Sequence, residues 1–380
     1  MLKRKNLIVF GTRPEAIKMA PLVMEFLKHP DDFVTKVCVT AQHREMLDQV
    51  LSFFEIKPDY DLDLMKPNQN LYSLTADIII GLKPILEEFE PDYIYVHGDT
   101  TTTMATSIAG FYSKSIVCHV EAGLRTNNMK SPFPEEMNRC VTGVLSTIHF
   151  SPTKTSKKNL VLENKPEASI VVTGNTVIDA LKYSVNKVKS VDFADNEINQ
   201  LEGILNKNRR IVLVTGHRRE NHGQGFINIC KALKKIALDN EDVQIIYPVH
   251  LNPNVQKPVY NLLKEIENIT LIAPISYPAF VWLMEKSYMI ITDSGGVQEE
   301  APSLGKPVLV MRDTTERPEA VEAGTVILVG TNQTKIVEET QKLLDNYEWY
   351  NQMKRLHNPY GDGKACNRIV EHILKDENER

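Results

Sequence analysis

The sequence predicts an α/β protein made of two Rossmann-like domains that face each other across a cleft. Three observations lead to this prediction. The chain has 380 residues, which is too long for one ordinary hydrophobic core and fits two domains. Short β-branched runs alternate with longer helical patterns, which favours a mostly parallel sheet with right-handed crossovers. The alternation also begins a second time near residue 170, where we place the domain boundary.

Residues 1–170 form the predicted N-terminal domain. Its strands are expected at residues 7–10, 34–40, 93–97, 116–120 and 148–151. Helices are expected between them at residues 16–28, 71–88 and 103–111, with a further helix ending at residue 54. Another helix begins after Pro132, Phe133 and Pro134 and carries two glutamates, Glu135 and Glu136.

Residues 171–360 form the predicted C-terminal domain. The second series of strands is expected at residues 169–172, 211–215, 244–249, 271–273, 289–292, 308–311 and 326–329. Residues 192–208 are polar and are expected at the surface. Helices close the chain from residue 331 onward, and we expect the last of them, residues 361–380, to join the N-terminal domain.

Composition excludes several classes of function. Hydrophobic residues make up 42% and charged residues 24% of the chain, as in a soluble globular protein. The net charge of -5 and the pI near 6.1 argue against a general nucleic-acid or membrane binder. The five cysteines have no CxxC spacing, so we expect free thiols in a reducing cytoplasm and no metal site. No signal peptide or run of transmembrane length is visible.

The stretch around residues 289–323 carries the first functional signal. A buried strand is followed by Asp293, Ser294, Gly295 and Gly296, and then by a short helix predicted over residues 297–304. Glycines and a helix start present free amides, so this turn favours a phosphate group. The alternative is a tight turn with exposed glutamates. The dense polar loop of residues 312–319, at the end of the next strand, favours the phosphate site.

Polar side chains also follow many other predicted strands. In a doubly wound sheet the carboxyl edge faces the ligand, so we expect these groups to converge. They are Arg13, His43, Asp99, Glu121, Arg125, His217, Arg218, His250, Ser294 and Arg312. Asp99 precedes a run of threonines, and taken alone this pattern favours a helix cap over a functional role. His119 lies inside an apolar run and is interpreted as a core residue.

Nine ordered motifs resemble those of a known family. They are GTRPEAIKMAP (11–21), AQHREML (41–47), HGDTTTT (97–103), HVEAGLRT (119–126), PFPEEMNR (132–139), TGNTVID (173–179), GHRREN (216–221), PVHLNPNV (248–255) and DSGGVQEEAPSLGKPVL (293–309). Together they resemble the non-hydrolysing UDP-N-acetylglucosamine 2-epimerases. The resemblance implies a glycosyltransferase-B-like fold, conversion of UDP-N-acetylglucosamine (UDP-GlcNAc) to UDP-N-acetylmannosamine (UDP-ManNAc) for cell-surface polysaccharide synthesis, a homodimer, and no cofactor.

The resemblance also implies roles for individual residues. The catalytic positions are Asp99, Glu121, Glu135 and His217. The UDP-binding positions are Arg13, Lys18, His217, Ser294, Gly295, Gly296, Glu300 and Arg312, with Glu300 on the ribose hydroxyls. For Glu135 the alternative is a first-turn acid that is favoured by the helix dipole.

The chemistry of the expected reaction agrees with these residue types. The C2 proton of the sugar adjoins no carbonyl, so its direct removal has no stabilisation. Expulsion of UDP from C1 makes that proton acidic and gives a 2-acetamidoglucal; UDP then re-adds while C2 is protonated from the other face. This route needs groups that stabilise the diphosphate and at least one carboxylate that transfers a proton.

A second, activating UDP-GlcNAc is implied for bacterial members of the family. The matching residues here are Gln42, His43, Gln69, Glu136, Arg218 and His250. Asn68 stands where an arginine is expected, and the loss of a bidentate phosphate partner would weaken such a site.

Three other functions remain open from the residues. A hydrolysing 2-epimerase would release free N-acetylmannosamine and UDP, and nothing in the motif spacing excludes water. A retaining glycosyltransferase would bind a UDP-sugar equally well, although the three carboxylates favour an epimerase. A catalytically inactive nucleotide-sugar sensor is disfavoured because every expected acid and base position is filled.

Overall fold

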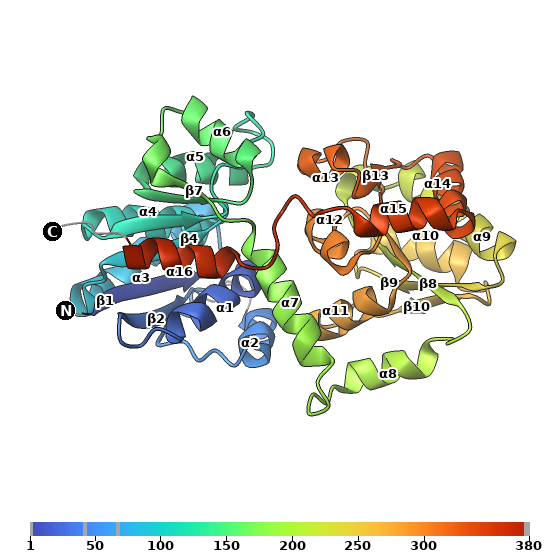
Figure 1. Cartoon of the computed structure of the whole chain (residues 1–380), viewed down its shortest axis with the longest axis horizontal. Helices are drawn as coiled ribbons and strands as arrows, with labels where there is room; N and C mark the ends of the chain where they lie inside the picture. The colour runs from blue at the N-terminus through green and yellow to red at the C-terminus, as the bar shows by residue number, and fades with distance from the viewer. Residues whose placement is uncertain (1–2, 41–43, 66–68, 376–380) are drawn as a thin grey trace. The chain divides into compact units, whose positions relative to one another are not determined.

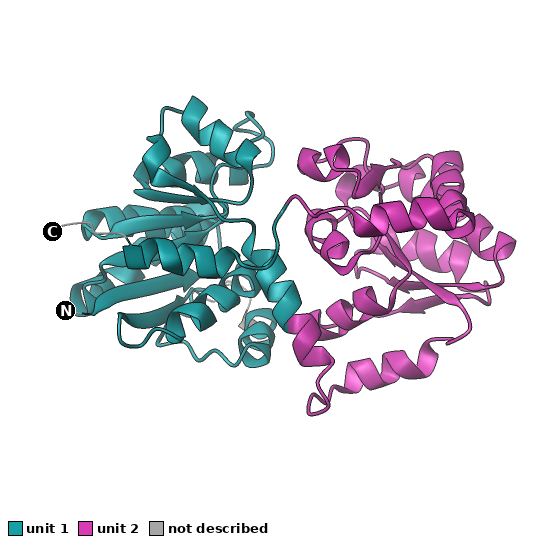
Figure 2. Ribbon diagram, viewed as in Figure 1, with its two compact units in different colours: residues 1–183, 360–380 teal, residues 184–359 magenta. Residues whose placement is uncertain are grey.

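The computed structural model describes residues 3–40, 44–65 and 69–375. The chain folds into two compact units (Figure 2). Unit 1 comprises residues 1–183 and 360–380, and unit 2 comprises residues 184–359. The chain therefore crosses from one unit to the other twice, between Tyr183 and Ser184 and between Pro359 and Tyr360.

Unit 1 contains a seven-stranded parallel sheet in the order β3-β2-β1-β4-β5-β6-β7 (Figure 1). Its strands are β1 (Arg4–Phe10), β2 (Phe33–Val39), β3 (Tyr60–Asp61), β4 (Tyr93–His97), β5 (Ile116–Val120), β6 (Ile148–Ser151) and β7 (Ile170–Val172). Strand β4 is buried along its whole length, because both faces of a parallel sheet are covered by its crossover connections. Sequence order reverses between β1 and β4, so the carboxyl ends of these two strands border the crevice in which ligands bind in open α/β sheets.

Several helices of unit 1 begin at a residue whose side chain caps the helix. They are α1 (Arg13–Leu27), α2 (Arg44–Phe53), α3 (Leu71–Phe89), α4 (Thr101–Tyr112), α5 (Glu135–Leu145), α6 (Lys154–Leu162), the 3₁₀ turn η1 (Glu167–Ser169), α7 (Thr176–Val188) and α16 (Ala365–Lys375). Thr12, Asn70, Thr100 and Thr153 each accept a hydrogen bond from a first-turn amide. The C-terminal helix α16 packs against α1, where Asn367 donates to Glu25 at 2.8 Å.

Unit 2 contains a six-stranded parallel sheet in the order β10-β9-β8-β11-β12-β13. Its strands are β8 (Arg210–Thr215), β9 (Val243–Pro248), β10 (Ile269–Ile272), β11 (Met289–Thr292), β12 (Val308–Val310) and β13 (Val326–Leu328). Its helices are α8 (Asn196–Ile204), η2 (Arg219–Asn221), α9 (Gln224–Asp239), α10 (Pro253–Leu263), α11 (Tyr277–Lys286), α12 (Gly295–Glu300), η3 (Ala301–Leu304), α13 (Pro318–Glu322), α14 (Gln333–Asp345) and α15 (Tyr347–Arg355). Here the order reverses between β8 and β11.

The structure corrects one detail of the sequence prediction and refines two others. The strand expected to open the second series is β7, which pairs in parallel with β6 and completes the first sheet. The division between the units therefore falls within α7 and not near residue 170. Residues 192–208 lie mostly at the surface, as predicted, and α8 packs there against α11 through the buried Ile198 and Leu201. The helix predicted over residues 297–304 is a short α-helix followed by a 3₁₀ turn at Pro302, which has no amide hydrogen to donate.

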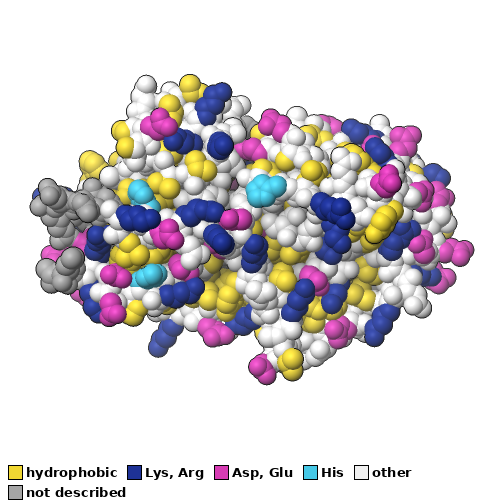
Figure 3. Space-filling view, viewed as in Figure 1, with side chains coloured by type: hydrophobic (Ala, Val, Ile, Leu, Met, Phe, Trp, Pro, Cys, Tyr) yellow, Lys and Arg dark blue, Asp and Glu magenta, His cyan; other side chains and the backbone are white. Residues whose placement is uncertain are grey.

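The described part of the chain has no helix that is long and apolar enough to cross a membrane. On the face shown in Figure 3, acidic and basic side chains are interspersed, and no large patch of one sign is visible. This distribution agrees with the small net charge of the chain.

Three histidines are buried in the sheet of unit 1. They are His97 in β4, His119 in β5 and His149 in β6, and His119 lies beside His149 in the register of the strands. Burial lowers the pKa of His97 and of His149 to about 4, and lowers the pKa of His119 well below its usual value. The folded unit therefore keeps these three rings neutral at neutral pH.

We predict that His149→Leu reduces the acid sensitivity of the fold. Below pH 6.5 His149 binds a proton in the unfolded chain but stays neutral in the folded chain. The free energy of unfolding therefore falls as the pH drops from about 6.5 to about 4. A shift of this size corresponds to roughly 3 kcal/mol for one buried histidine at the acid end. The measurement is the calorimetric unfolding midpoint at pH 7 and pH 5, with His29→Leu, a partly exposed histidine of the same unit, as the control. If the unfolding midpoints of the wild type and His149→Leu depended equally on pH, His149 would not be the neutral, buried ring described above.

Candidate functional site

The loops after β1 and β4 meet at the crevice of unit 1. Gly11 begins the first loop, and a β-carbon at this position would lie 2.0 Å from Oγ1 of Thr40 and 2.5 Å from Oγ1 of Thr102. Only glycine therefore allows the loop to approach the ends of the neighbouring strand and helix so closely.

Glu15 ties these two loops together. Its buried carboxylate accepts hydrogen bonds from the amides of Gly11 and Thr12, at 3.0 and 2.8 Å, and from the hydroxyls of Thr100 and Thr103. Burial raises the pKa of Glu15, and these hydrogen bonds act in the opposite direction. Sequence analysis missed Glu15, although the T-x-x-E spacing of a capping box, from Thr12 to Glu15, was a visible signal.

Glu121 is the centre of the polar cluster in unit 1. It follows β5 in the left-handed conformation, with φ 63°, and its side chain is 4% exposed. One carboxylate oxygen accepts from Arg139 at 3.1 Å, and the other accepts from Asn175 at 3.0 Å and pairs with Lys18. Two cations and an amide therefore balance the buried negative charge.

Arg139 of α5 connects Glu121 to Asp99. Its guanidinium forms an ion pair with Asp99 at 2.6 Å and also donates to the backbone carbonyl of Glu121 at 3.1 Å. The side chain of Asp99 is 31% exposed, so this carboxylate is far more accessible than Glu121. Nε2 of His97 lies 3.6 Å from Glu121, and its ring is neutral at neutral pH because burial lowers its pKa. Neither Arg139 nor His97 was singled out from the sequence.

The two glutamates at the start of α5 have different surroundings. Glu136 accepts hydrogen bonds from the amides of Thr126 and Asn127, at 3.0 and 2.8 Å, and so holds the loop after β5. Glu135 has a buried carboxylate oxygen for which the described residues offer no hydrogen-bond donor. Arg125 forms a bidentate pair with Glu163, at 2.6 and 2.9 Å.

In unit 2 the loops after β8 and β11 are joined by Asp293. This fully buried residue accepts hydrogen bonds from the amides of His217 and Arg218, at 2.9 and 2.8 Å, and from the side chain of Asn221 at 3.3 Å. The ring of His217 stacks on that of His250, with centroids 5.4 Å apart. The pKa of His217 is lowered, chiefly by burial and further by Arg218 and His250, while Asp293 acts in the opposite direction.

The start of α12 is flanked by two arginines. A β-carbon on Gly295 would lie 3.9 Å from a guanidinium nitrogen of Arg218 and 4.0 Å from one of Arg317. The Nε of Arg218 is buried and finds no acceptor among the described residues. A helix start with free amides and two guanidinium groups is a suitable environment for a phosphate anion. Sequence analysis predicted the glycines but gave no role to Arg317.

The other charged residues near this turn form contacts within unit 2. Arg317 pairs with the buried Glu299, whose carbonyl also accepts from Asn358 at 2.7 Å. Arg312 is buried and donates to Glu220 at 2.7 Å. Glu300 lies beside the helix start, with a carboxylate oxygen 3.7 Å from the position of a β-carbon on Gly296.

The residues expected for an activator are distributed over both units. Gln69 and Glu136 belong to unit 1, and Arg218 and His250 belong to unit 2. Gln69 donates to the carbonyl of Leu64 at 2.8 Å. Gln42, His43 and Asn68 lie outside the described residues.

Two expected UDP-binding residues lie on one helix of unit 1. Arg13 begins α1, and Lys18 lies one turn further along that helix.

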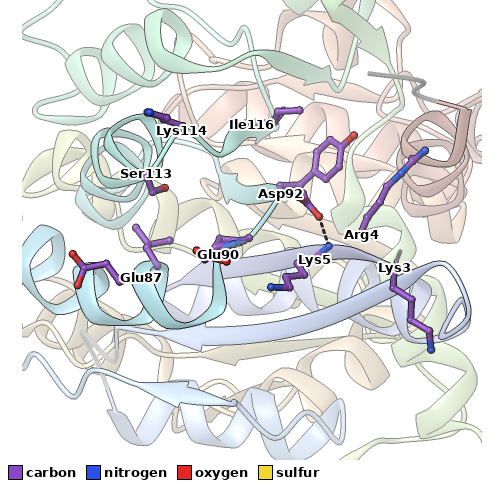
Figure 4. Close-up of a pocket in the computed structure, with 12 residues that line it drawn as sticks. Lys3, Arg4, Lys5, Glu87, Glu90, Asp92, Ser113, Lys114 and Ile116 are labelled. Carbon is purple, nitrogen blue, oxygen red and sulfur yellow. Dashed lines mark hydrogen bonds between the residues drawn. The ribbon is translucent and has the colours of Figure 1, made fainter. Parts of the chain in front are cut away.

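A hollow of about 820 Å³ lies at the opposite edge of the sheet in unit 1 (Figure 4). It is lined by the amino ends of β1, β4 and β5, with Arg4, Lys5, Asp92 and Tyr93 among the residues at its wall. None of the expected site residues lines this hollow. Within the described ranges, no three His, Cys, Asp or Glu residues are arranged to hold a metal ion.

Comparisons with known proteins identify the family and the fold. The family model described as UDP-N-acetylglucosamine 2-epimerase matches residues 25–374. The chain is 56% identical to UDP-N-acetylglucosamine 2-epimerase of Campylobacter jejuni over 99% of this chain and 98% of the relative. It is 59% identical to the Escherichia coli K12 protein of the same name, over 97% of each chain. A structure of UDP-GlcNAc 2-epimerase from Neisseria meningitidis bound to UDP-GlcNAc superposes with a TM-score of 0.89 at 55% identity, covering 98% of this chain and 100% of that one.

The fold is therefore that of two Rossmann-like units, as predicted, and the structural neighbours share it. A match over residues 25–374 covers most of the chain. On this evidence the chain belongs to the UDP-N-acetylglucosamine 2-epimerase family.

Proposed function

We propose that this protein interconverts UDP-GlcNAc and UDP-ManNAc without releasing the free sugar. The observation that carries the proposal is the buried cluster of Lys18, Glu121 and Arg139, with Asp99 beside it, at the crevice of unit 1. A glycosyltransferase has no need of such a group of carboxylates, whereas removal and return of a proton at C2 requires it. The relatives named UDP-N-acetylglucosamine 2-epimerase support the same reaction.

Unit 2 supplies the nucleotide side of the proposed site. The diphosphate binds at Ser294, Gly295 and Gly296, where Arg218 and Arg317 add positive charge. The lowered pKa of His217 favours a neutral ring at neutral pH, and a neutral ring carries one N–H group. We assign this N–H as a hydrogen-bond donor to the departing diphosphate. Glu300, beside the same helix start, accepts from the ribose hydroxyls. Arg13 and Lys18 of α1 add positive charge on the side of unit 1.

The carboxylates of unit 1 divide the remaining work. Glu121 is held by Lys18, Arg139 and Asn175, so it is suited to remain a carboxylate and to stabilise the positive charge that develops at C1. Asp99 is accessible, and Glu135 has an oxygen that the described residues do not engage. We assign these two residues to proton transfer on opposite faces of C2, through a 2-acetamidoglucal.

The reaction predicts uptake of a solvent hydrogen at C2. When the protein is incubated with UDP-GlcNAc in heavy water, it should form UDP-ManNAc that carries deuterium at C2. Proton NMR follows this reaction. Asp99→Asn should lower the rate roughly 10²- to 10⁴-fold, because it removes a proton carrier. Glu167→Gln, an exposed carboxylate of unit 1, is the control and should keep the full rate.

The same NMR experiment separates the rival functions. Free N-acetylmannosamine and UDP would identify a hydrolysing epimerase. An unchanged substrate would refute the proposal and leave a transferase or a sensor. UDP-ManNAc that retains the original hydrogen at C2 would exclude proton transfer with solvent.

We further propose that a second UDP-GlcNAc activates the enzyme through Arg218, His250, Glu136 and their neighbours. The buried Nε of Arg218, which has no acceptor in the part of the chain that the structure describes, supports an anionic ligand beside the diphosphate site. With UDP-ManNAc as the only substrate, the initial rate should be low and should rise when a small amount of UDP-GlcNAc is added. A full initial rate without UDP-GlcNAc would rule out the activator. Arg218→Lys should weaken the response, since lysine cannot donate in the same bidentate way.

We also infer a homodimer, and α3 and α4 offer the surface for it. Exposed apolar side chains of these helices include Tyr72, Ile80, Phe111 and Tyr112. Between the helices is a groove of about 410 Å³, lined by Ile79, Ile80, Leu86, Ala109 and Tyr112 with Lys83 and Glu87 at its side. An apolar face with one basic and one acidic residue is self-complementary about a two-fold axis.

The dimer predicts a change of mass on one substitution. Wild-type protein should have the mass of a dimer in size-exclusion chromatography with light scattering, and Ile80→Glu should have that of a monomer, because a charge would be buried in the interface. Val191→Glu changes a fully exposed apolar residue of unit 2 and should leave the mass unchanged. A dimeric Ile80→Glu with a native circular dichroism spectrum would place the interface elsewhere.

The proposed product also indicates its use. UDP-ManNAc is an activated sugar, so a glycosyl transfer reaction must consume it, and we place that reaction in cytoplasmic steps of cell-surface polysaccharide synthesis.

A further inference from the structure

Asn175 is buried at the point where α7 begins, and both polar atoms of its side chain form hydrogen bonds. Its Oδ1 accepts the amide of Val177 at 3.1 Å, in the first turn of α7. That contact orients the side-chain amide, so Nδ2 is the atom that donates to Oε2 of Glu121 at 3.0 Å. Sequence analysis quoted this residue within the TGNTVID motif and gave it no role.

Asn175 also contacts the segment in which the chain returns to unit 1. Its backbone amide donates to the carbonyl of Tyr360 at 2.7 Å. The adjoining glycines are in close contact, since a β-carbon on Gly174, at φ 89°, would lie 3.3 Å from the α-carbon of Gly361. Both segments that connect the units, α7 and the stretch at residue 360, are therefore anchored on Asn175.

The returning segment is fixed by further contacts. Asp179 of α7 accepts the amides of Ala365 and Cys366, at 3.1 and 2.9 Å. Arg368 binds the carboxylate of Asp362 at 2.9 and 2.7 Å and the carbonyl of Thr173 at 2.8 Å. The pKa of Asp362 is lowered to about 2 by this arginine, so the pair stays charged at working pH. The position of Asn175 is therefore set by the crossing of the two segments.

We propose that Asn175 is a positioning residue that fixes the orientation of the Glu121 carboxylate in the reaction, an inference that rests on the proposed function. The charged or titratable side chains around this carboxylate include Lys18 of α1, His97 of β4, Arg139 of α5 and, paired with Arg139, Asp99 after β4. Lys18 and Arg139 can each donate in several directions. The side chain of Asn175 is held by α7 through Oδ1, so its donation from Nδ2 to Oε2 fixes the rotation of the carboxylate and therefore which oxygen faces which cation.

Two substitutions separate this role from a structural one. Asn175→Ser keeps a side-chain acceptor for the amide of Val177, since serine caps helices as well as asparagine, but is too short to reach Glu121. Asn175→Asp keeps both the cap and the shape, and places a second carboxylate 3.0 Å from Glu121. Two carboxylates at this distance do not both ionise at their usual pH, so one holds a proton.

We expect Asn175→Ser to have an unfolding midpoint temperature within about 2 °C of that of the wild type. Its kcat should fall about tenfold or more, with little change in KM. Asn175→Asp should move the acid limb of the kcat profile to higher pH by about one unit or more. A neutral residue at position 175 should leave the acid limb of the kcat profile where it lies in the wild type. Asn175→Gln should therefore have the same pH profile as Asn175→Ser. An unchanged pH profile in Asn175→Asp, or a full kcat in Asn175→Ser, would overturn the inference.

A direct titration distinguishes this inference from the proposed function. Carboxyl ¹³C NMR of glutamate-labelled protein, with the Glu121 signal assigned by its loss in Glu121→Gln, reports the carboxylate without any substrate. The Glu121 signal should titrate at higher pH in Asn175→Asp than in the wild type. A wild type without epimerase activity would refute the proposed function, and this titration would still test the contact. Identical Glu121 titrations in the two proteins would show that Asn175 does not act on the carboxylate.

Discussion

The buried carboxylate of Glu121 is the constraint on which the site of unit 1 depends. A charge taken out of water is tolerated only with partners, and removal of one partner from a buried pair costs about 3–5 kcal/mol. Lys18 from α1, Arg139 from α5 and Asn175 before α7 converge on it, so a single carboxylate fixes the positions of three helices relative to β5. The left-handed backbone of Glu121 is maintained by the same contacts, with Arg139 also holding its carbonyl.

Unit 2 uses the same construction at its own reversal of strand order. Asp293 takes the place of Glu121 as the buried acid, but its partners are backbone amides of His217 and Arg218. An acid that binds amides fixes the path of a loop, whereas an acid that binds cations fixes side chains. This difference fits the proposed division of work, in which unit 2 presents a backbone turn to a diphosphate and unit 1 presents charged groups to a sugar.

Much of the fold could be predicted because local signals agree with the global one. Apolar runs such as Met289–Thr292 are buried strands, and polar residues after them lie at the carboxyl edge of the sheet. The boundary was missed because the β7 run resembles the start of a new series, and only its pairing with β6 assigns it. Asp99 and Glu121 were predicted at the site, but Arg139 was not, since a helical arginine 18 residues beyond Glu121 shows its role only in three dimensions. Asn175 was hidden for the same reason.

The central claim is that unit 2 holds the UDP group while the acids of unit 1 act on C2 of the sugar. A crystal structure of the protein with UDP-GlcNAc tests it most directly. The account predicts the diphosphate beside Ser294 and against the amides of Gly295 and Gly296, and a carboxylate of Asp99 or Glu135 within hydrogen-bonding distance of the C2 substituents. A nucleotide bound elsewhere, with these carboxylates remote from the sugar, would contradict it.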